Sequence, residues 1–150
     1  MPRLLVVHHT PSPACQALLE AVLAGAGSDA LADVEVVTRP ALTAGAADVL
    51  AADGFLLGTP ANIGYVSGAL KHFFDQVYYP VLDAARGRPF GAWVHGNDDT
   101  TGAERAIETI TTGLGWRRVA PTLSIVGPPS TDDLAACTEL GGTLAATLLP

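Results

Sequence analysis

Short apolar runs recur along the chain at intervals that suit buried strands. A run that is apolar at consecutive positions, without polar alternation, is typical of a strand covered on both faces, as in a parallel sheet. The fifth run contains Pro121, which predicts an edge position because proline cannot donate to a strand ladder. The five predicted strands are Arg3–His8, Val34–Thr38, Gly54–Leu57, Phe90–His95 and Val119–Val126.

Helical segments follow each of these runs. The clearest begins near Val66 and reaches Tyr79, where apolar residues recur at three- and four-residue spacing until Pro80 ends or kinks the helix. The last helix has Ser130 or Thr131 as its N-cap. The other predicted helices are Gln16–Leu23, Ala44–Ala52 and Ala103–Thr112, and the last runs over Asp132–Leu148.

Strict alternation of five strands and five helices predicts one domain over residues 1–150, a three-layer α/β sandwich around a five-stranded parallel sheet. We predict the strand order 2-1-3-4-5. In that order strands one, three and four are neighbours, so their outgoing loops 9–15, 59–65 and 95–102 meet at one edge of the sheet, where open α/β sheets bind ligands. The stretch 59–64 is too rich in Gly, Pro and Asn to be regular structure.

Charge and cysteine content narrow the functional class. The net charge is −7, and Lys71 is the single lysine among eight basic residues, so a nucleic-acid or anionic-membrane surface is not expected. Cys15 and Cys137 are too few to form a disulfide framework, which fits a reducing compartment. Neither a signal peptide nor a membrane-spanning stretch is evident, and we expect a soluble, cytoplasmic protein.

The three loops carry the candidate chemistry. The first leads into a helix N-terminus, where free backbone N–H groups and the helix dipole favour an anion such as a phosphate. Its donors are the hydroxyls of Thr10 and Ser12 and the backbone of Ala14 and Cys15, although the two hydroxyls could serve only as helix caps. At a helix N-terminus the Cys15 thiol could be redox-active, or it could simply fill space.

The second and third loops suit a flat ring. Asn62, Ile63 and Tyr65 could border such a ring, and Gly64 allows close approach or a positive φ. The third loop offers backbone groups at Gly96 and Asn97. Asp98 and Asp99 follow, and we expect their side chains to point outward, because acidic groups disfavour an anionic ring beside them. A phosphate in one loop and flat surfaces in the other two would suit flavin mononucleotide (FMN).

The segment GTPANIGYVSGALKHFFDQ, residues 58–76, resembles a family pattern. It is similar to G-[ST]-P-x-x-x-G-x-[MV]-S-[GA]-x-[LM]-K-x-F-[IFL]-D in the NAD(P)H-dependent FMN reductase and quinone oxidoreductase branch of the flavodoxin-like FMN proteins. The resemblance implies a flavodoxin-like fold, FMN as cofactor, NAD(P)H as electron donor and a quinone or similar small molecule as acceptor. It also implies a homodimer or homotetramer. The matching residues are Gly58, Thr59, Pro60, Gly64, Ser67, Gly68, Leu70, Lys71, Phe73 and Asp75.

The resemblance also assigns site residues. The FMN phosphate would be held by Thr10, Ser12, Ala14 and Cys15. The isoalloxazine ring near N5 would be held by Pro60, Ala61, Asn62, Ile63, Gly64 and Tyr65. Its pyrimidine side would be lined by His95, Gly96, Asn97 and Gly102. We nominate no catalytic acid, base or metal ligand, because the flavin supplies the chemistry.

Other hypotheses stay open. A flavodoxin-type electron carrier would bind FMN without turning over a substrate of its own, and the net charge of −7 permits the acidic docking face that such carriers use. A flavin-less binding module on the same fold is a further alternative. His8, His9 and His95 lie at strand ends and could form a metal site with Asp98, although no metal-ligand spacing supports it; histidines bonded to backbone are the simpler interpretation. We interpret Lys71, Phe73 and Asp75 as structural residues.

Overall fold

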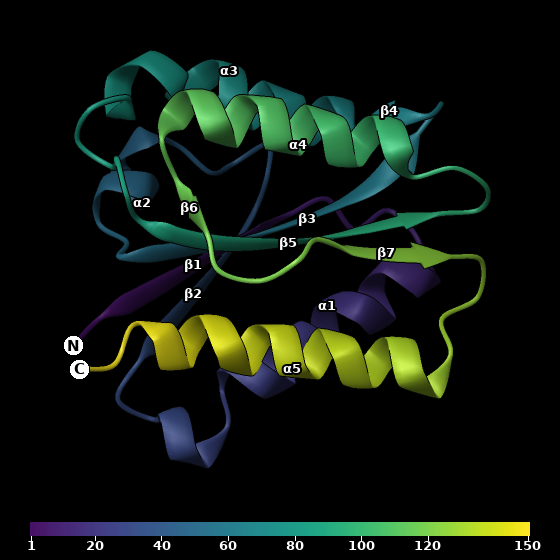
Figure 1. Cartoon of the computed structure of the whole chain (residues 1–150), viewed down its shortest axis with the longest axis horizontal. Coiled ribbons are helices and arrows are strands. Elements are labelled where there is room, and N and C mark those ends of the chain that lie inside the picture. The colour runs from purple at the N-terminus through teal and green to yellow at the C-terminus, as the bar shows by residue number, and fades with distance from the viewer.

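A parallel sheet forms the middle layer of the structure, a computed structural model that describes all residues 1–150 (Figure 1). Its strands lie in the order β2-β1-β3-β5-β6, and β7 pairs with β5 beyond the end of β6. If β6 and β7 are counted as the fifth strand, this is the predicted order 2-1-3-4-5. The strands are β1 (Arg3–His8), β2 (Glu35–Pro40), β3 (Gly54–Asn62), β5 (Pro89–Gly96), β6 (Arg117–Arg118) and β7 (Leu123–Val126).

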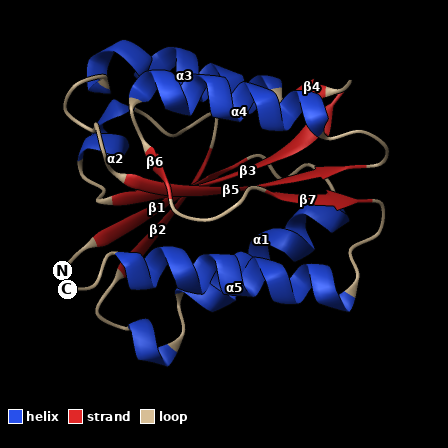
Figure 2. Cartoon of the chain, viewed as in Figure 1, coloured by secondary structure: helices blue, strands red, loops and turns tan.

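Helices cover both faces of this sheet, as Figure 2 shows. On one side lie α2 (Ala46–Leu50), α3 (Gly68–Val81) and α4 (Thr101–Leu114). On the other side lie α1 (Pro13–Ala26) and α5 (Thr131–Thr147). The predicted three-layer α/β sandwich is therefore confirmed. A short 3-10 turn, Asp29–Leu31, precedes β2. None of the helices has the length and hydropathy that crossing a membrane requires.

Two separate cores explain why the strand sequences lack polar alternation. Leu5 and Val7 of β1 pack in the core shared with α3 and α4, while Leu4 and Val6 pack in the core shared with α1 and α5. Successive side chains of a strand point to opposite faces, and here each face meets a helical layer. All four side chains are therefore buried, and β1 contributes to both cores.

The second core depends on close contact between α1 and α5. A Cβ atom on Gly25 of α1 would lie 1.8 Å from the backbone oxygen of Thr138, and one on Gly141 of α5 would lie 2.0 Å from that of Val22. No side chain fits at either position, because real Cβ atoms do not approach backbone so closely. The two helices therefore pack backbone against backbone.

The predicted fifth strand is corrected in its extent. Val119–Val126 was expected to be one strand, but pairing with β5 occurs at Arg117–Arg118 and again at Leu123–Val126. Pro121 lies in the unpaired gap between them. The edge position itself is confirmed, since no further strand pairs outside β6 or β7.

The prediction that residues 59–64 are irregular is wrong for 59–62 and is confirmed only for the turn at Ile63 and Gly64. β3 continues to Asn62, and β4 (Tyr65–Val66) pairs back against it in an antiparallel hairpin. Pro60 is tolerated in this central strand because β1 has ended: the last β1 partner, His8, pairs with Gly58. Backbone groups two residues apart point to the same side of a strand, so the missing N–H of Pro60 lies on the side that β1 has left.

Two alanine substitutions in α5 test the close packing of α1 and α5. Gly141→Ala should lower the free energy of unfolding by about 1–3 kcal/mol, the usual cost of overpacking a core. Gly142→Ala is the matched control, because its methyl group would meet nothing closer than the Gly25 oxygen at 3.6 Å. This control should be as stable as the parent, or up to ~1 kcal/mol more stable, because alanine favours helix. Urea denaturation measures both, and equal stabilities would contradict the packing.

Candidate functional site

The loop after β1 and the carboxyl ends of β3 and β5 line one cleft at the carboxyl edge of the sheet, as the predicted strand order requires. The cleft has a volume of about 290 Å³. None of its lining residues is acidic, and none is lysine or arginine, so its electrostatics are set by backbone dipoles and one imidazole. The lining residues are Pro11, Ser12, Pro13, Ala14, Cys15, Pro60, Ala61, Asn62, His95, Gly96 and Asn97.

The first loop presents free donors at the start of α1. Ser12 is the N-cap of this 14-residue helix, and its hydroxyl oxygen accepts a hydrogen bond from the Cys15 N–H at 3.2 Å. The backbone N–H groups of Ser12 and Ala14 donate to no acceptor in the protein. Pro11 and Pro13 carry no N–H and fix the local backbone. Ser12 can therefore cap the helix and still donate to a phosphate, because its hydroxyl oxygen accepts the capping bond and its hydroxyl proton stays free.

Thr10 lies away from its predicted place on the cleft, whereas Cys15 lies on it. The Thr10 hydroxyl lies 2.6 Å from His8 Nδ1, and Thr10 does not line the cleft. Burial, together with the neighbouring His9, lowers the pKa of His8, so its ring favours the neutral form in which Nδ1 can accept that proton. Cys15 does line the cleft, although it is largely buried under the start of α1.

The 59–65 segment divides at the hairpin turn. Pro60, Ala61 and Asn62 reach the cleft, whereas Ile63, Gly64 and Tyr65 lie outside it. The hairpin is anchored by Thr59, whose hydroxyl oxygen accepts from the Ser67 N–H at 3.1 Å and whose proton is donated to the Pro60 carbonyl at 2.8 Å. Ser67 in turn caps α3 by accepting from the Leu70 N–H. The family pattern thus encodes a hairpin joined to a helix cap.

Ile63 at the tip of this hairpin has an unfavourable backbone. Its φ is +50°, and that of Gly64 is +73°. Two consecutive positive φ angles are typical of a two-residue hairpin turn, for which Asn-Gly is the preferred sequence. A β-branched residue in this region is an outlier, and the Ile63 side chain is fully exposed.

The third loop contributes His95, Gly96 and Asn97. His95 Nε2 lies 2.9 Å from the carbonyl oxygen of Gly127. Because a carbonyl can only accept, Nε2 carries the proton, and Nδ1 of the neutral ring is left as an acceptor. A side chain at Gly96 would crowd Ala61 and Thr100, so its backbone closes the cleft where the second and third loops meet.

The two aspartates of this loop point away from the cleft. Asp98 and Asp99 are exposed, as expected, and neither lines the cleft. Asp99 Oδ1 accepts a hydrogen bond from the Thr101 N–H at 2.9 Å, at the start of α4, and this bond lowers the pKa of Asp99. Gly102 also lies outside the cleft. A Cβ there would be 1.9 Å from the Gly64 oxygen, so Gly102 lets α4 pack against the hairpin.

The remaining family-pattern residues are structural, as interpreted from the sequence. Lys71 pairs with Asp75 one turn later, with Nζ to Oδ1 at 2.7 Å, and Phe73 is fully buried. Gly58 lies directly against the indole of Trp93, where a Cβ would be 2.1 Å from the ring. Pro11 and Pro13 also line the cleft but were not predicted as site residues. Their position in the 9–15 loop, beside Ser12 and Ala14, could have indicated them.

The histidines do not gather into a metal site. No group of three or more His, Cys, Asp or Glu side chains is placed to hold a metal ion. His95 bonds to backbone, as the simpler interpretation expects, whereas His8 bonds to the Thr10 hydroxyl and His9 Nδ1 is buried without a partner. Cys137 is buried in the other core, which raises the pKa of its thiol to about 11 and makes it unreactive.

Replacing Ile63 by asparagine should stabilise the protein. Asparagine adopts the left-handed region more readily, and relief of a cost of roughly 1–2 kcal/mol should raise the free energy of unfolding by about 1 kcal/mol. No packing is lost, because the side chain is exposed. Ile63→Val is the control, since it keeps the β-branch and should gain nothing. A matching gain for valine in urea denaturation would refute the assignment of strain.

Comparison with known proteins places this fold and cleft in context. The sequence model described as NADPH-dependent FMN reductase matches residues 14–126, well over half of the chain. A curated flavodoxin of Aquifex aeolicus (strain VF5) is 34% identical over 104 residues, which are 65% of this chain and 55% of that protein. The chain therefore spans about half the length of this curated relative.

Solved structures show the same fold at low identity. A flavodoxin from the domain Archaea superposes with a TM-score of 0.84 and 19% identity, covering 97% of this chain and 98% of the other. A flavodoxin, WrbA-like protein from Agrobacterium tumefaciens gives a TM-score of 0.76 and 20% identity over 99% and 98% of the two chains. These likenesses establish the flavodoxin-like α/β architecture. The sequence match over residues 14–126 shows that the chain belongs to the NADPH-dependent FMN reductase family.

Proposed function

We propose that the protein is an FMN-dependent oxidoreductase that passes electrons from NAD(P)H to a quinone or similar acceptor, with FMN in the cleft formed by the three loops. The observation that carries this proposal is the meeting of a donor-rich helix N-terminus and the uncharged ends of β3 and β5 around one cleft. When bound, FMN would accept a hydride from the nicotinamide and pass the electrons to the acceptor. The family description supports this chemistry.

The residues present fit the phosphate end of FMN. The Ser12 and Ala14 N–H groups and the Ser12 hydroxyl proton are available as donors, and α1 directs the positive end of its dipole to the same place. No carboxylate lines the cleft to repel the phosphate. Binding would therefore rely on dipoles rather than on a lysine or arginine.

The ring end would lie between the second and third loops. Pro60, Ala61 and Asn62 form one wall, and His95, Gly96 and Asn97 form the other. The flavin pyrimidine edge carries both acceptors and an N–H donor, and the His95 Nδ1 lone pair can accept that N–H. Because His95 is held by Gly127, its ring orientation is fixed before the flavin arrives.

An electron carrier of the flavodoxin type is the second candidate function. The curated relative and the archaeal structure are both named flavodoxin, and a carrier needs the same FMN cleft. The net charge of −7 would suit docking to basic redox partners. A carrier and a reductase differ in turnover, not in cofactor.

Titration of apoprotein with FMN, followed by quenching of flavin fluorescence, tests the cleft. Ala14→Asp should weaken FMN binding by roughly 10–100-fold, because a carboxylate would lie beside the phosphate. The same change should not lower stability, since an acidic residue in the first turn of a helix is favourable. Ala14→Asn is the uncharged control of equal shape and should bind FMN within about threefold of the parent.

Absence of FMN binding at tens of micromolar would overturn the proposal and favour a flavin-less module. Unchanged FMN affinity in Ala14→Asp would instead place the phosphate elsewhere. Steady-state oxidation of NADPH and NADH with a quinone then separates the two candidate functions. The reductase should turn over many times per flavin, whereas a protein that binds FMN without turnover is a carrier.

A further inference from the structure

One edge of the sheet is uncovered along its length. No strand pairs outside β6 or β7, and in Figure 1 both strands lie in front, between α4 and α5, with no other element across them. We call residues 117–126 the β6–β7 edge. An unpaired edge presents free backbone N–H and C=O groups to another extended chain.

Backbone groups of the β6–β7 edge point outward at alternate positions. The Gly127 N–H donates to the Gly96 carbonyl of β5, so residues two positions apart from Gly127 also face β5. Ser124 and Val126 therefore direct their N–H and C=O groups away from the sheet. Thr122 lies in the same outward series, and its N–H donates to no acceptor in the protein. The edge thus offers a short ladder of unpaired donors and acceptors.

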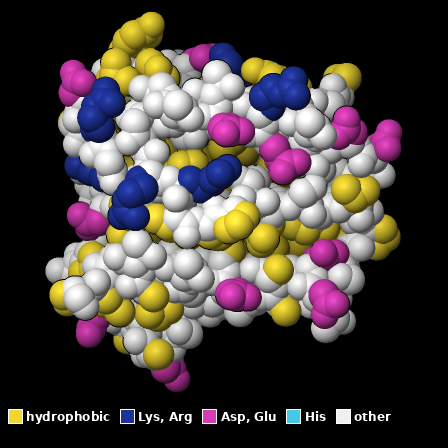
Figure 3. Space-filling view, in the orientation of Figure 1, with side chains coloured by type: hydrophobic (Ala, Val, Ile, Leu, Met, Phe, Trp, Pro, Cys, Tyr) yellow, Lys and Arg dark blue, Asp and Glu magenta, His cyan; other side chains and the backbone are white.

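Apolar side chains occupy the middle of this edge. A hollow of about 210 Å³ lies between the edge and α5, and its wall includes Ala120, Pro121, Leu123 and Leu140. Val126 is 52% exposed on the opposite face of β7. Figure 3 shows an apolar band across this side of the molecule. A band of this kind, rimmed by polar groups, is typical of a surface that contacts another protein.

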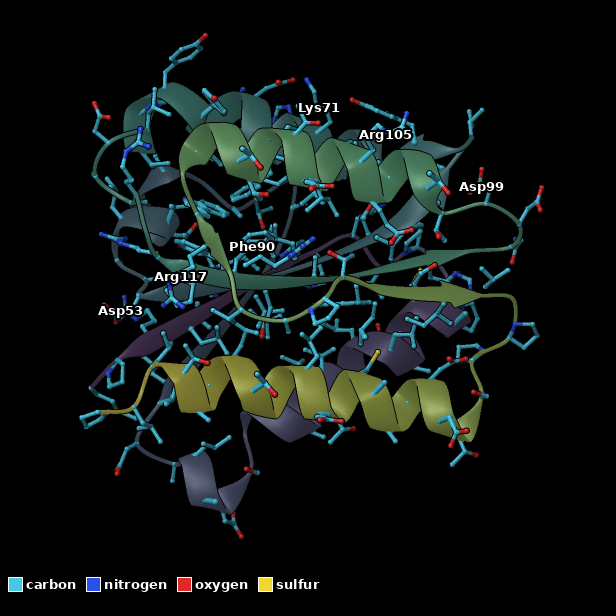
Figure 4. All side chains as sticks on the ribbon, viewed as in Figure 1. Asp53, Lys71, Phe90, Asp99, Arg105 and Arg117 are labelled. Carbon is cyan, nitrogen blue, oxygen red and sulfur yellow. The ribbon has the colours of Figure 1, made fainter.

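Opposite charges lie at the two ends of the edge. Arg117 and Arg118 are exposed at one end, and Asp98 and Asp99 are exposed at the other. None of these four side chains forms an ion pair within the chain. Figure 4 shows Arg117 and Asp99 far apart along the edge, and in Figure 3 basic side chains gather at the left of the apolar band, with acidic ones toward its right.

This distribution of charge is self-complementary. A second copy turned to run antiparallel would place its acidic end against the basic end of the first copy, and the reverse contact would form at the other end. A copy in the parallel direction would bring like charges together. The surface therefore matches an antiparallel copy of itself.

We propose that a second copy of this chain pairs antiparallel with the β6–β7 edge, about a two-fold axis close to Thr122, so that one sheet continues through both subunits. Backbone hydrogen bonds join the two edges, and the apolar bands cover one another. Arg118 lies near the partner's Asp98. Pro121 is compatible with this pairing, because it lies one position from Thr122 and its missing N–H faces β5 rather than the partner.

The proposed interface gives a defined surface to the homodimer that the family resemblance implies. It does not rest on the proposed function, because Asp98, Asp99 and residues 117–126 do not line the cleft. The dimer should therefore form with or without FMN.

Sedimentation velocity of the full-length protein between about 1 µM and 1 mM tests the proposal. We expect the average mass to rise from that of one chain toward that of two. Arg118→Glu should weaken the dimer at least about tenfold, because a carboxylate then lies beside the partner's Asp98. Asp98→Arg alone should weaken it similarly, and the double variant should return to within about threefold of the parent.

Arg39→Glu is the control for the charge reversals. It makes the same change on β2, the opposite edge of the sheet, and should leave the dimer unchanged. A protein that is monomeric at about 1 mM would overturn the proposal. A dimer that Arg118→Glu and Arg39→Glu affect equally, or one that the double variant does not restore, would overturn it as well.

Disulfide cross-linking tests the position of the two-fold axis. A residue close to the axis lies near its own copy, so Thr122→Cys should form a covalent dimer under mild oxidation. The native Cys15 and Cys137 are buried and should not react. Leu50→Cys, at an exposed position of α2, is the control and should remain a single chain on a non-reducing gel. Cross-linking of Thr122→Cys no greater than that of Leu50→Cys would overturn the proposed pairing.

Discussion

The parallel pairing of β1, β3 and β5 is the constraint on which the candidate site depends. His8 is paired with Gly58, Gly58 with Trp93, and Pro60 with His95. Adjacent strands are about 4.8 Å apart, so the three loops leave the sheet within roughly 10 Å of one another. This register is fixed by burial on both faces, because a slip of one residue would exchange the side chains that belong to the two cores. The cleft is therefore a consequence of core packing.

Unequal strand lengths then open the cleft. β1 ends at His8, whereas β3 continues past its last β1 partner to Asn62. The side of β3 that β1 leaves free carries Pro60, which has no N–H to satisfy, and the 9–15 loop lies across from it. Because Pro60 has no N–H, no neighbouring strand is required on this side to accept a hydrogen bond from it. The extended end of β3 turns back at Ile63 and is held by α4 through Gly102.

The residues of the family pattern stabilise the hairpin and its junction with α3. Thr59 and Ser67 link the hairpin to the start of α3 by hydrogen bonds, Gly58 makes room for Trp93, and Phe73 fills the core. Only Pro60 of the pattern lines the cleft. The pattern therefore identifies the fold of the second loop more directly than it identifies contacts to a cofactor.

The sequence by itself determined the α/β class and the alternation of strands and helices, because apolar runs and helical spacing report burial directly. The strand order 2-1-3-4-5, and with it the edge at which the candidate residues meet, was a prediction that only the observed strand pairing confirmed. Nine of the candidate residues lie on the cleft; Thr10, Ile63, Gly64, Tyr65 and Gly102 do not. Ile63, Gly64 and Tyr65 could not be separated beforehand, since they lie at a hairpin that depends on pairing between β3 and β4. Thr10 bonds to His8 and Gly102 packs against the hairpin, and both contacts arise only in the tertiary structure. Only the tertiary structure showed that β3 continues to Asn62 and that Gly102 of α4 packs against the hairpin, because strand pairing and helix packing are not recorded in any local pattern.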